Sequence, residues 1–332
     1  MRRASLSAAK DAQRSREADR NGFFVARTLT ALAAVAAMAT LRGEPLTIAT
    51  YNIENYVAAG RRVDDVYRPA YPKPEAAKEA LRRVMRALNA DVLALQEMGP
   101  AAYLEELRRD LRAEGLDYPY AALAEAADAD RHVAVLSRLP FRCIQTDADL
   151  EFAYFGGREK VKRGLLEVTL AIGPVDLTLF VVHLRSRFTD RPEDPGSAVC
   201  RAGEAGAVRN HVLRRFPDPA TAHFLILGDC NDTKGSKPLR LLTKRGQTVI
   251  AKLLDAADRR GDTWTYVYFK SDTYERVDHM LASPALLPAV AGGRARIYDG
   301  PGVREASDHR PVVVTLELGK PNAQEIAVGG VP

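Results

Sequence analysis

Short apolar runs that end in polar residues recur along the middle of this chain. Phe224 to Leu227 is continuously apolar, which predicts a strand buried on both faces, and Gly228-Asp229-Cys230-Asn231-Asp232 follows it at once. Leu46 to Tyr51 alternates apolar and polar residues, as a first core strand would, and ends in Asn52-Ile53-Glu54-Asn55. One such ending is equally typical of an ordinary Asx turn, so its repetition matters more than any single case.

The remaining pattern mixes strands and helices. Helical spacing predicts amphipathic helices at Glu75 to Asn89, around Leu104, Leu107 and Leu111, and from about Glu204 to Phe216. Further strands are predicted at Asp91–Leu95, His132–Ser137, Leu165–Ile172, Val175–Val182, Thr263–Phe269, Val277–Ala282 and Val312–Leu318. Loops are expected at 56–74 and, as a mobile segment, at Asp190 to Gly206. Strict βαβ alternation is missing, which favours an α+β sandwich of sheets with helices outside.

The N-terminal residues differ in composition from the rest. Residues 1–28 are polar and basic, and Leu29 to Leu41 is uncharged and Ala-rich, with Ala37-Met38-Ala39 as an A-x-A cleavage site. This predicts a secretory signal, with a disordered tail and surface helix as the alternative. Without residues 1–39, 41 basic and 40 acidic residues remain. The sequence pI of about 9.1 therefore owes much to the leader and is weak evidence for a nucleic-acid partner.

These features predict a domain organisation and a location. We expect a leader at 1–42, one domain at 43–320 and a frayed tail at 321–332. The protein is expected to be secreted or periplasmic and monomeric, with no stable membrane span in its mature form. It is expected to be cytoplasmic if the start codon is misassigned, and membrane-attached if residues 29–41 remain as an anchor. The three cysteines show no metal-binding spacing.

Polar groups at several strand ends suggest shared chemistry. Carboxylates and amides that meet at one rim form an oxygen-rich pocket, and such ligands select Mg²⁺, or alternatively Mn²⁺, over zinc. Glu97 is predicted to be the principal metal ligand, because it follows a buried strand in which nothing else accounts for a charged side chain. The residues concerned are Asn52, Glu97, His183, Asp229, Asn231, Asp308 and His309.

Six short blocks contain these residues and their neighbours. In chain order they are Thr50-Tyr51-Asn52-Ile53, Leu95-Gln96-Glu97, Val182-His183-Leu184, Gly228-Asp229-Cys230-Asn231, Val277-Asp278-His279-Met280-Leu281 and Ser307-Asp308-His309-Arg310-Pro311-Val312. In this order the blocks resemble the signatures of the endonuclease/exonuclease/phosphatase superfamily, the fold of deoxyribonuclease I and neutral sphingomyelinases. The resemblance spans roughly residues 46–318 and implies a four-layer α/β/β/α sandwich of two mainly antiparallel sheets.

The resemblance implies a role for each matching residue. It assigns Glu97, with Asn52 and Asp308, to Mg²⁺. It assigns Asp229 to the attacking water and His309, oriented by Asp278, to the scissile phosphate. It also implies that Asn231, His183 and Arg163 face the phosphate.

The implied activity is in-line hydrolysis of a phosphoester by a Mg²⁺-dependent phosphodiesterase or nuclease. A phosphatase or a phospholipase-type enzyme of the same fold is the alternative. A nucleic-acid substrate rests on analogy alone. A non-catalytic binding module would be marked by loss of Glu97, Asp229 or His309, and all three are present.

Overall fold

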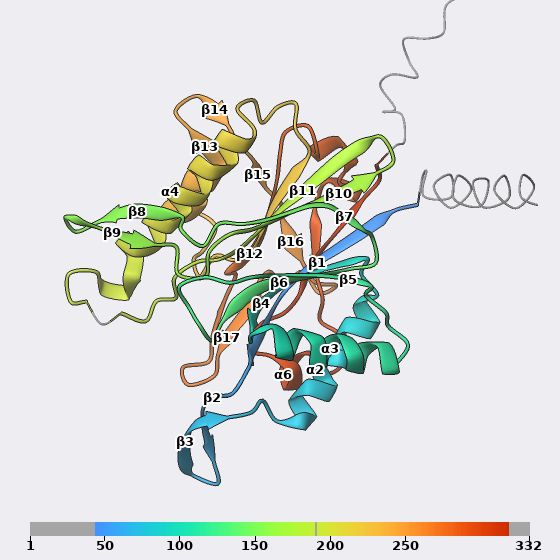
Figure 1. The fold of residues 1–332 in the computed structure, drawn as a ribbon, viewed down its shortest axis with the longest axis vertical. Coiled ribbons are helices and arrows are strands. Elements are labelled where there is room, and N and C mark those ends of the chain that lie inside the picture. The colour runs from blue at the N-terminus through green and yellow to red at the C-terminus, as the bar shows by residue number, and fades with distance from the viewer. Residues whose placement is uncertain (1–43, 190, 319–332) are drawn as a thin grey trace, which may run out of the picture. The chain divides into compact units, whose positions relative to one another are not determined.

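Two large β-sheets face each other between helices (Figure 1). The structure is a computed structural model and describes residues 44–189 and 191–318. The predicted leader, with its cleavage site at Ala37–Ala39, and the predicted tail therefore lie outside the described residues. The helices are α2 (Glu75–Leu88), α3 (Ala101–Ala113), α4 (Ala198–Arg215), α5 (Lys237–Thr243) and α6 (Val303–Ala306), with 3₁₀ turns at Pro195–Ser197, Leu287–Ala289 and Ala291–Gly293.

The first sheet has seven strands, in which β1 pairs parallel with β4 and antiparallel with β21. In spatial order they are β16 (Ala256–Ala257), β20 (Ala295–Ile297), β21 (Val312–Leu316), β1 (Leu46–Tyr56), β4 (Val92–Met98), β6 (His132–Ser137) and β5 (Tyr120–Ala124).

The second sheet has six strands, in which β12 pairs parallel with β11 and antiparallel with β19. In spatial order they are β15 (Lys252–Leu253), β19 (Asp278–Ala282), β12 (Phe224–Asp229), β11 (Val175–His183), β10 (Leu166–Ile172) and β7 (Phe141–Thr146). Antiparallel pairs predominate in both sheets, as expected for the predicted sandwich.

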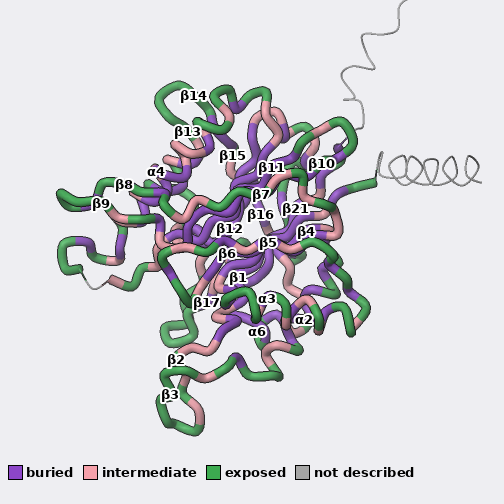
Figure 2. Tube along the Cα trace, viewed as in Figure 1, coloured by how far each residue is buried: buried purple, intermediate pink, exposed green. Residues whose placement is uncertain are grey.

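Three apolar clusters hold the layers together. One contains residues of both sheets, such as Ile48 and Leu227, and fills the space between them. A second joins the outer face of the first sheet to α2 and α3, and a third joins the outer face of the second sheet to α4. Figure 2 shows the buried residues concentrated along the strands. The four-layer α/β/β/α sandwich predicted from sequence is confirmed.

Two predicted loops were wrong. Residues 56–74 contain the hairpin of β2 (Ala59–Val63) and β3 (Val66–Tyr71), which projects beyond the end of β1 (Figure 1). The helix predicted from about Glu204 begins at Ala198, within the segment expected to be mobile. The start was missed because the carboxylate of Asp194, outside the helix, accepts hydrogen bonds from the N–H groups of Val199 and Cys200.

Three more hairpins lie outside the main sheets. They are β8 (Glu151–Tyr154) with β9 (Gly157–Lys160), β13 (Lys244–Arg245) with β14 (Thr248–Val249), and β17 (Tyr266–Tyr268) with β18 (Thr273–Glu275).

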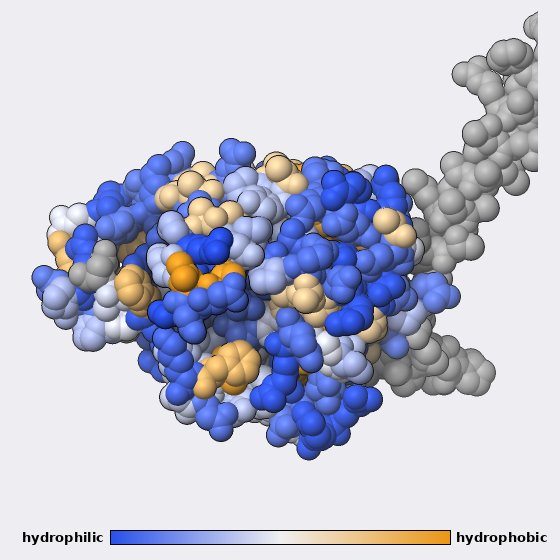
Figure 3. All heavy atoms as spheres, turned by 90° about the horizontal axis from the view of Figure 1, so that it is seen from below, coloured by the Kyte–Doolittle hydropathy of each residue, from blue (hydrophilic) through white to orange (hydrophobic). Residues whose placement is uncertain are grey.

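On the face drawn in Figure 3, apolar residues form separate small groups within a hydrophilic surface. Among the described residues, no helix is both long and apolar enough to cross a bilayer.

Candidate active site

The register of the second sheet places three of the predicted residues in one row. His183, the last residue of β11, pairs with Asp229, the last residue of β12, and Asp229 pairs with Asp278, the first residue of β19. All three are buried. Neighbouring strands lie about 4.8 Å apart, so one imidazole and two carboxylates are brought together although they are far apart in sequence.

Gly228 permits this close pairing. Its φ of 141° lies in a region that L side chains rarely adopt, and an added Cβ would lie 1.9 Å from the carbonyl oxygen of Val182. Only glycine lets β12 approach β11 this closely while turning the next residue, Asp229, into the site.

The first sheet contributes Asn52 and Glu97. Asn52 pairs with Gln96, and the register between β1 and β4 is broken immediately afterwards. Glu97 lies in this irregularity with a φ of 62°. A bulge of this kind re-aims a side chain. The Glu97 carboxylate therefore points away from the core and accepts a hydrogen bond of 2.8 Å from the backbone N–H of Asn55.

Asn52 and Asp229 link the two sheets. The amide nitrogen Nδ2 of Asn52 donates to Oδ2 of Asp229 at 3.0 Å, and Oδ1 of Asn52 accepts from the backbone N–H of Glu54 at 3.0 Å. Asp229 also accepts a hydrogen bond from the backbone N–H of Asn231, and the Asn231 amide donates to the Leu184 carbonyl oxygen.

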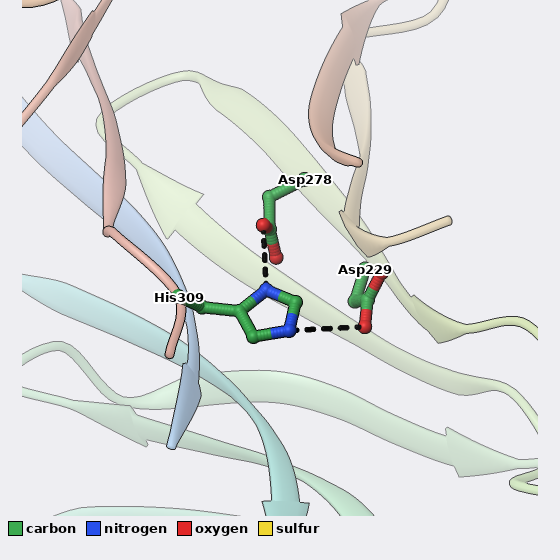
Figure 4. Close-up of side chains that lie close together, drawn as sticks. All are labelled: Asp229, Asp278 and His309. Atoms are coloured by element: carbon green, nitrogen blue, oxygen red, sulfur yellow. Dashed lines mark hydrogen bonds and ion pairs between the residues drawn. The ribbon is translucent and has the colours of Figure 1, made fainter. Parts of the chain in front are cut away.

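His309 lies between two carboxylates (Figure 4). Its Nδ1 is 2.8 Å from Oδ2 of Asp278, and its Nε2 is 3.9 Å from Oδ2 of Asp229. The His309 backbone N–H donates to the hydroxyl of Ser307, and the Tyr266 ring lies 4.8 Å from the imidazole, centre to centre. The ring is therefore held in one orientation by Asp278, as the family resemblance implied.

The charges on this pair favour a protonated histidine. Burial lowers the pKa of His309, but the negative charge of Asp278 and its hydrogen bond outweigh this and raise the pKa well above its usual value. Burial raises the pKa of Asp229 to about 7, a change that the charge of His309 partly offsets. At neutral pH the site thus combines an imidazolium with a carboxylate of about the basicity that suits a general base.

Acidic groups also gather at the corner occupied by Glu97 and Asp308. Burial raises the pKa of Asp308 to about 6, opposed by His309 and reinforced by the charges of Glu54 and Glu97. A cation bound between these carboxylates would remove their repulsion. The oxygen donors here, including that of Asn52, have the chemistry that Mg²⁺ prefers.

His183 and Arg163, both implied to face the phosphate, are buried. His183 is 2% exposed, and burial, together with the charges of Arg163 and His309, holds its pKa well below the usual value. Its Nε2 is 3.5 Å from Oδ2 of Asp229 and 4.0 Å from Oε1 of Glu97. Arg163 is 6% exposed, and its Nε lies 3.3 Å from Asp128. His183 thus adjoins Asp229 and Glu97 from within the protein, and the contact of His183 and Arg163 with phosphate stays a prediction.

A cavity of about 570 Å³ opens onto these groups. Five predicted residues line it: Glu97, Asp229, Asn231, Asp308 and His309.

Aromatic residues and one arginine make up a further part of the cavity wall. It includes Arg187, Phe188, Tyr266 and Tyr268, of which Phe188 is 75% exposed. Two signals in the sequence concerned part of this wall: the aromatic composition of the predicted strand at 263–269, and the basic pair Arg185 and Arg187, which suits either a solvated rim or an anionic substrate. The family blocks do not include these residues.

Two sets of residues could hold a metal. Asp229, Asp278 and His309 offer ligand atoms within 4.8 Å of one another. However, the Asp278–His309 hydrogen bond uses the facing atoms of both side chains, and a protonated histidine cannot ligate. The predicted set of Asn52, Glu97 and Asp308 offers only oxygen atoms, so the donor chemistry favours this set for a hard cation.

Residues 49–309 match the endonuclease/exonuclease/phosphatase family. The chain belongs to this family. Its members are phosphoric ester hydrolases that generally depend on a divalent metal, so the chain is an enzyme of this class. No curated protein matches the chain significantly in sequence.

Solved structures of this family share the fold. A family protein from Leptotrichia buccalis is 17% identical, with a TM-score of 0.58 over 82% of this chain and 100% of its own. Sphingomyelinase C from Streptomyces griseocarneus is 16% identical, with a TM-score of 0.55 over 82% and 99%. The human Nocturnin catalytic domain with a bound sulfate anion is 14% identical, with a TM-score of 0.57 over 82% and 93%. At these identities, the likeness concerns the fold alone.

Proposed function

We propose that this protein is a Mg²⁺-dependent phosphodiesterase that hydrolyses nucleic acid by in-line attack of water on phosphorus. The observation that carries the proposal is the meeting of Glu97, Asp229 and His309 at one cavity. They lie on different strands or loops, and no packing requirement explains three ionisable groups at one opening. Perturbed ionisable groups in a cleft are typical of catalytic sites.

The residues fit a divalent ion at the Glu97 corner. Glu97 and Asp308 would supply carboxylate oxygens, and Asn52 retains a second lone pair on Oδ1. When bound, Mg²⁺ supplies a positive charge for the phosphate oxygens. The protein groups around it orient the substrate and move the proton.

Asp229 and His309 then divide the proton chemistry. Asp229 takes a proton from the attacking water, because its raised pKa makes it a stronger base than an exposed aspartate. His309, charged through its contact with Asp278, donates from Nε2 to the phosphate group and stabilises its developing charge. As the new P–O bond forms, the bond to the leaving oxygen breaks. That oxygen takes a proton from solvent and departs as an alcohol, the proton held by Asp229 returns to solvent, and the nucleic-acid strand is left with a phosphomonoester end.

The wall of the cavity supports a nucleic-acid substrate. Phe188 and Tyr268 present exposed aromatic rings, on which bases can stack. Arg187, beside them, contributes a positive charge, although it pairs with Glu275 at 2.6 Å. The same exposed rings give the one specific observation in favour of the second candidate, a phospholipase of the sphingomyelinase type, because apolar rings also suit a lipid.

A substrate panel tests these alternatives. Plasmid DNA, single-stranded DNA, RNA, sphingomyelin, inositol phosphates and bis-p-nitrophenyl phosphate are each incubated with Mg²⁺ and with EDTA. We expect cleavage of nucleic acid that stops with EDTA and falls steeply with added salt, because a polyanion binds partly by releasing counterions. Selective turnover of sphingomyelin would favour the second candidate, and activity that ignores chelators would refute both.

We also propose that the enzyme is an exported monomer. The proposal is supported by the signal-like pattern of residues 29–41 with Ala37-Met38-Ala39. N-terminal sequencing of protein recovered from the periplasm or medium should begin near residue 40, whereas a retained leader would contradict export by cleavage.

A further inference from the structure

Helix α4 directs two buried charged side chains at the loops around the cavity. Arg201 is 3% exposed and Glu204 is fully buried. Charged side chains are rarely buried to this degree without partners. Their partners are mainly backbone groups of segments that carry site residues.

Glu204 joins two of these segments. Its Oε1 accepts a hydrogen bond of 3.0 Å from the backbone N–H of Lys162, and its Oε2 accepts one of 2.5 Å from the backbone N–H of Arg185. Lys162 precedes Arg163, and Arg185 lies two residues after His183. A carboxylate is required here, because only it offers two acceptor oxygens in one plane.

Arg201 joins a further pair of segments. Its Nη1 donates to the carbonyl oxygens of Arg185 at 3.1 Å and of Gly196 at 3.0 Å, and its Nε donates to Oδ2 of Asp232 at 3.0 Å. Asp232 directly follows Asn231, which lines the cavity. The planar guanidinium can reach these acceptors together because its five N–H groups point in fixed directions.

Further hydrogen bonds of Arg201 connect α4 to the part of the cavity wall that contains Phe188. Arg201 also donates to the carbonyl oxygen of Ser197 at 3.4 Å, and the Ser197 hydroxyl donates to the carbonyl oxygen of Phe188 at 2.7 Å. Phe188 and Arg187 line the same cavity as Asp229. The backbone that carries them is therefore fixed to α4 through Arg185 and through Ser197.

We propose that Arg201 and Glu204 are positioning residues that hold the substrate-contacting residues 186–188 in place beside the phosphate site. The proposal rests on the proposed function, because it takes the cavity as the substrate site. Fixing this backbone before binding reduces the ordering cost of association. Asp229 keeps its own contacts with Asn52 and with the backbone of Asn231. Loss of the Arg201 or Glu204 hydrogen bonds should therefore affect substrate binding more than the chemical step.

Steady-state kinetics of two variants test this. In Glu204→Gln, the single carbonyl oxygen can satisfy only one of the two N–H groups, and in Arg201→Lys the ammonium cannot reach every acceptor. On the substrate that the panel identifies, we expect KM to rise by up to about tenfold, because the loosened backbone of residues 186–188 must be ordered when substrate binds. We expect kcat to stay within about threefold.

Matched controls separate positioning from general destabilisation. Glu167→Gln changes another buried carboxylate, which accepts from His211 and Arg215, and Arg82→Lys changes a buried arginine on α2. Neither residue lines the cavity. Both controls should lower the melting temperature without raising KM. An equal rise in KM in the controls, or an unchanged KM in the α4 variants, would overturn the proposal.

Hydrogen exchange gives a readout that does not depend on activity. The amides of Lys162 and Arg185 should exchange faster in Glu204→Gln than in the wild type, and amides of the central strands should not. Ser197→Ala, which removes one hydroxyl, provides a mild variant if Arg201→Lys does not fold, and should raise KM about threefold. Inactive wild-type protein would refute the proposed function, whereas unchanged exchange at these amides would refute the positioning role.

Discussion

Asp278→Asn tests whether catalysis needs His309 to be oriented and charged by Asp278, because the substitution leaves His309 itself in place. In the wild type, Oδ2 of Asp278 lies 2.8 Å from Nδ1 of His309, and both residues are nearly inaccessible to water. A hydrogen bond to a charged group contributes about 1.5–3 kcal/mol. The substitution removes the negative charge, so the pKa of His309 should fall by about 1–2 units.

Loss of the Asp278 charge should change both the rate of catalysis and its dependence on pH. If the full energy of the contact stabilises the transition state, kcat/KM should fall about 10- to 150-fold. His309 acts while protonated, so the alkaline limb of the pH profile should shift to lower pH. The pKa of folded His309 is raised, so its protonation stabilises the fold fully below the unfolded pKa of about 6.5. This contribution is lost as pH rises through the folded value, and the variant should lack most of it at neutral pH.

The assay is kcat/KM measured from pH 5 to pH 10 for the wild type, for Asp278→Asn and for Asp91→Asn. Asp91 accepts a hydrogen bond from the backbone N–H of Thr47 outside the cavity, so it controls for the loss of a partly buried carboxylate. A rate within twofold of the wild type, with an unmoved alkaline limb, would show that Asp278 does not act through His309.

Three further substitutions examine the remaining groups. Glu97→Gln should raise the Mg²⁺ concentration needed for half-maximal rate by tenfold or more, and an unchanged requirement would remove Glu97 from the metal site. Asp229→Asn should abolish turnover. In EDTA, the wild-type protein should lose stability as pH rises from about 4 to 7, because a carboxyl whose pKa is raised to about 7 destabilises the fold as it ionises. Asp229→Asn should lose less stability over this range, and an identical pH slope in thermal melts would contradict this. Gly228→Ala should destabilise the protein by about 2–6 kcal/mol, since both backbone strain and the clash with Val182 oppose it, and a melting temperature near the wild-type value would refute the close approach.

Much of the site was predictable because its residues directly follow apolar strands. Asp229 and Asn231 come just after the continuous apolar run Phe224–Leu227, and Asp278 and His309 lie in blocks whose order matched the family. The local pattern identifies such residues because a charged side chain directly after a buried strand is not explained by packing and is typical of a functional residue on a rigid scaffold. The hairpin at residues 59–71 and the start of α4 were missed, because the first has weak alternation and the second is capped from outside the helix.

Sequence alone determined the class of fold, the family and the residue types available for catalysis, because periodicity and motif order are properties of the chain. Tertiary structure decided which of those residues meet. Strand register set His183, Asp229 and Asp278 side by side, and a bulge turned Glu97 toward the site. It also placed Phe188 and Tyr268 on the cavity wall and buried Arg201 and Glu204 of α4 against its loops. These outcomes depend on pairing between distant segments, which no local pattern encodes.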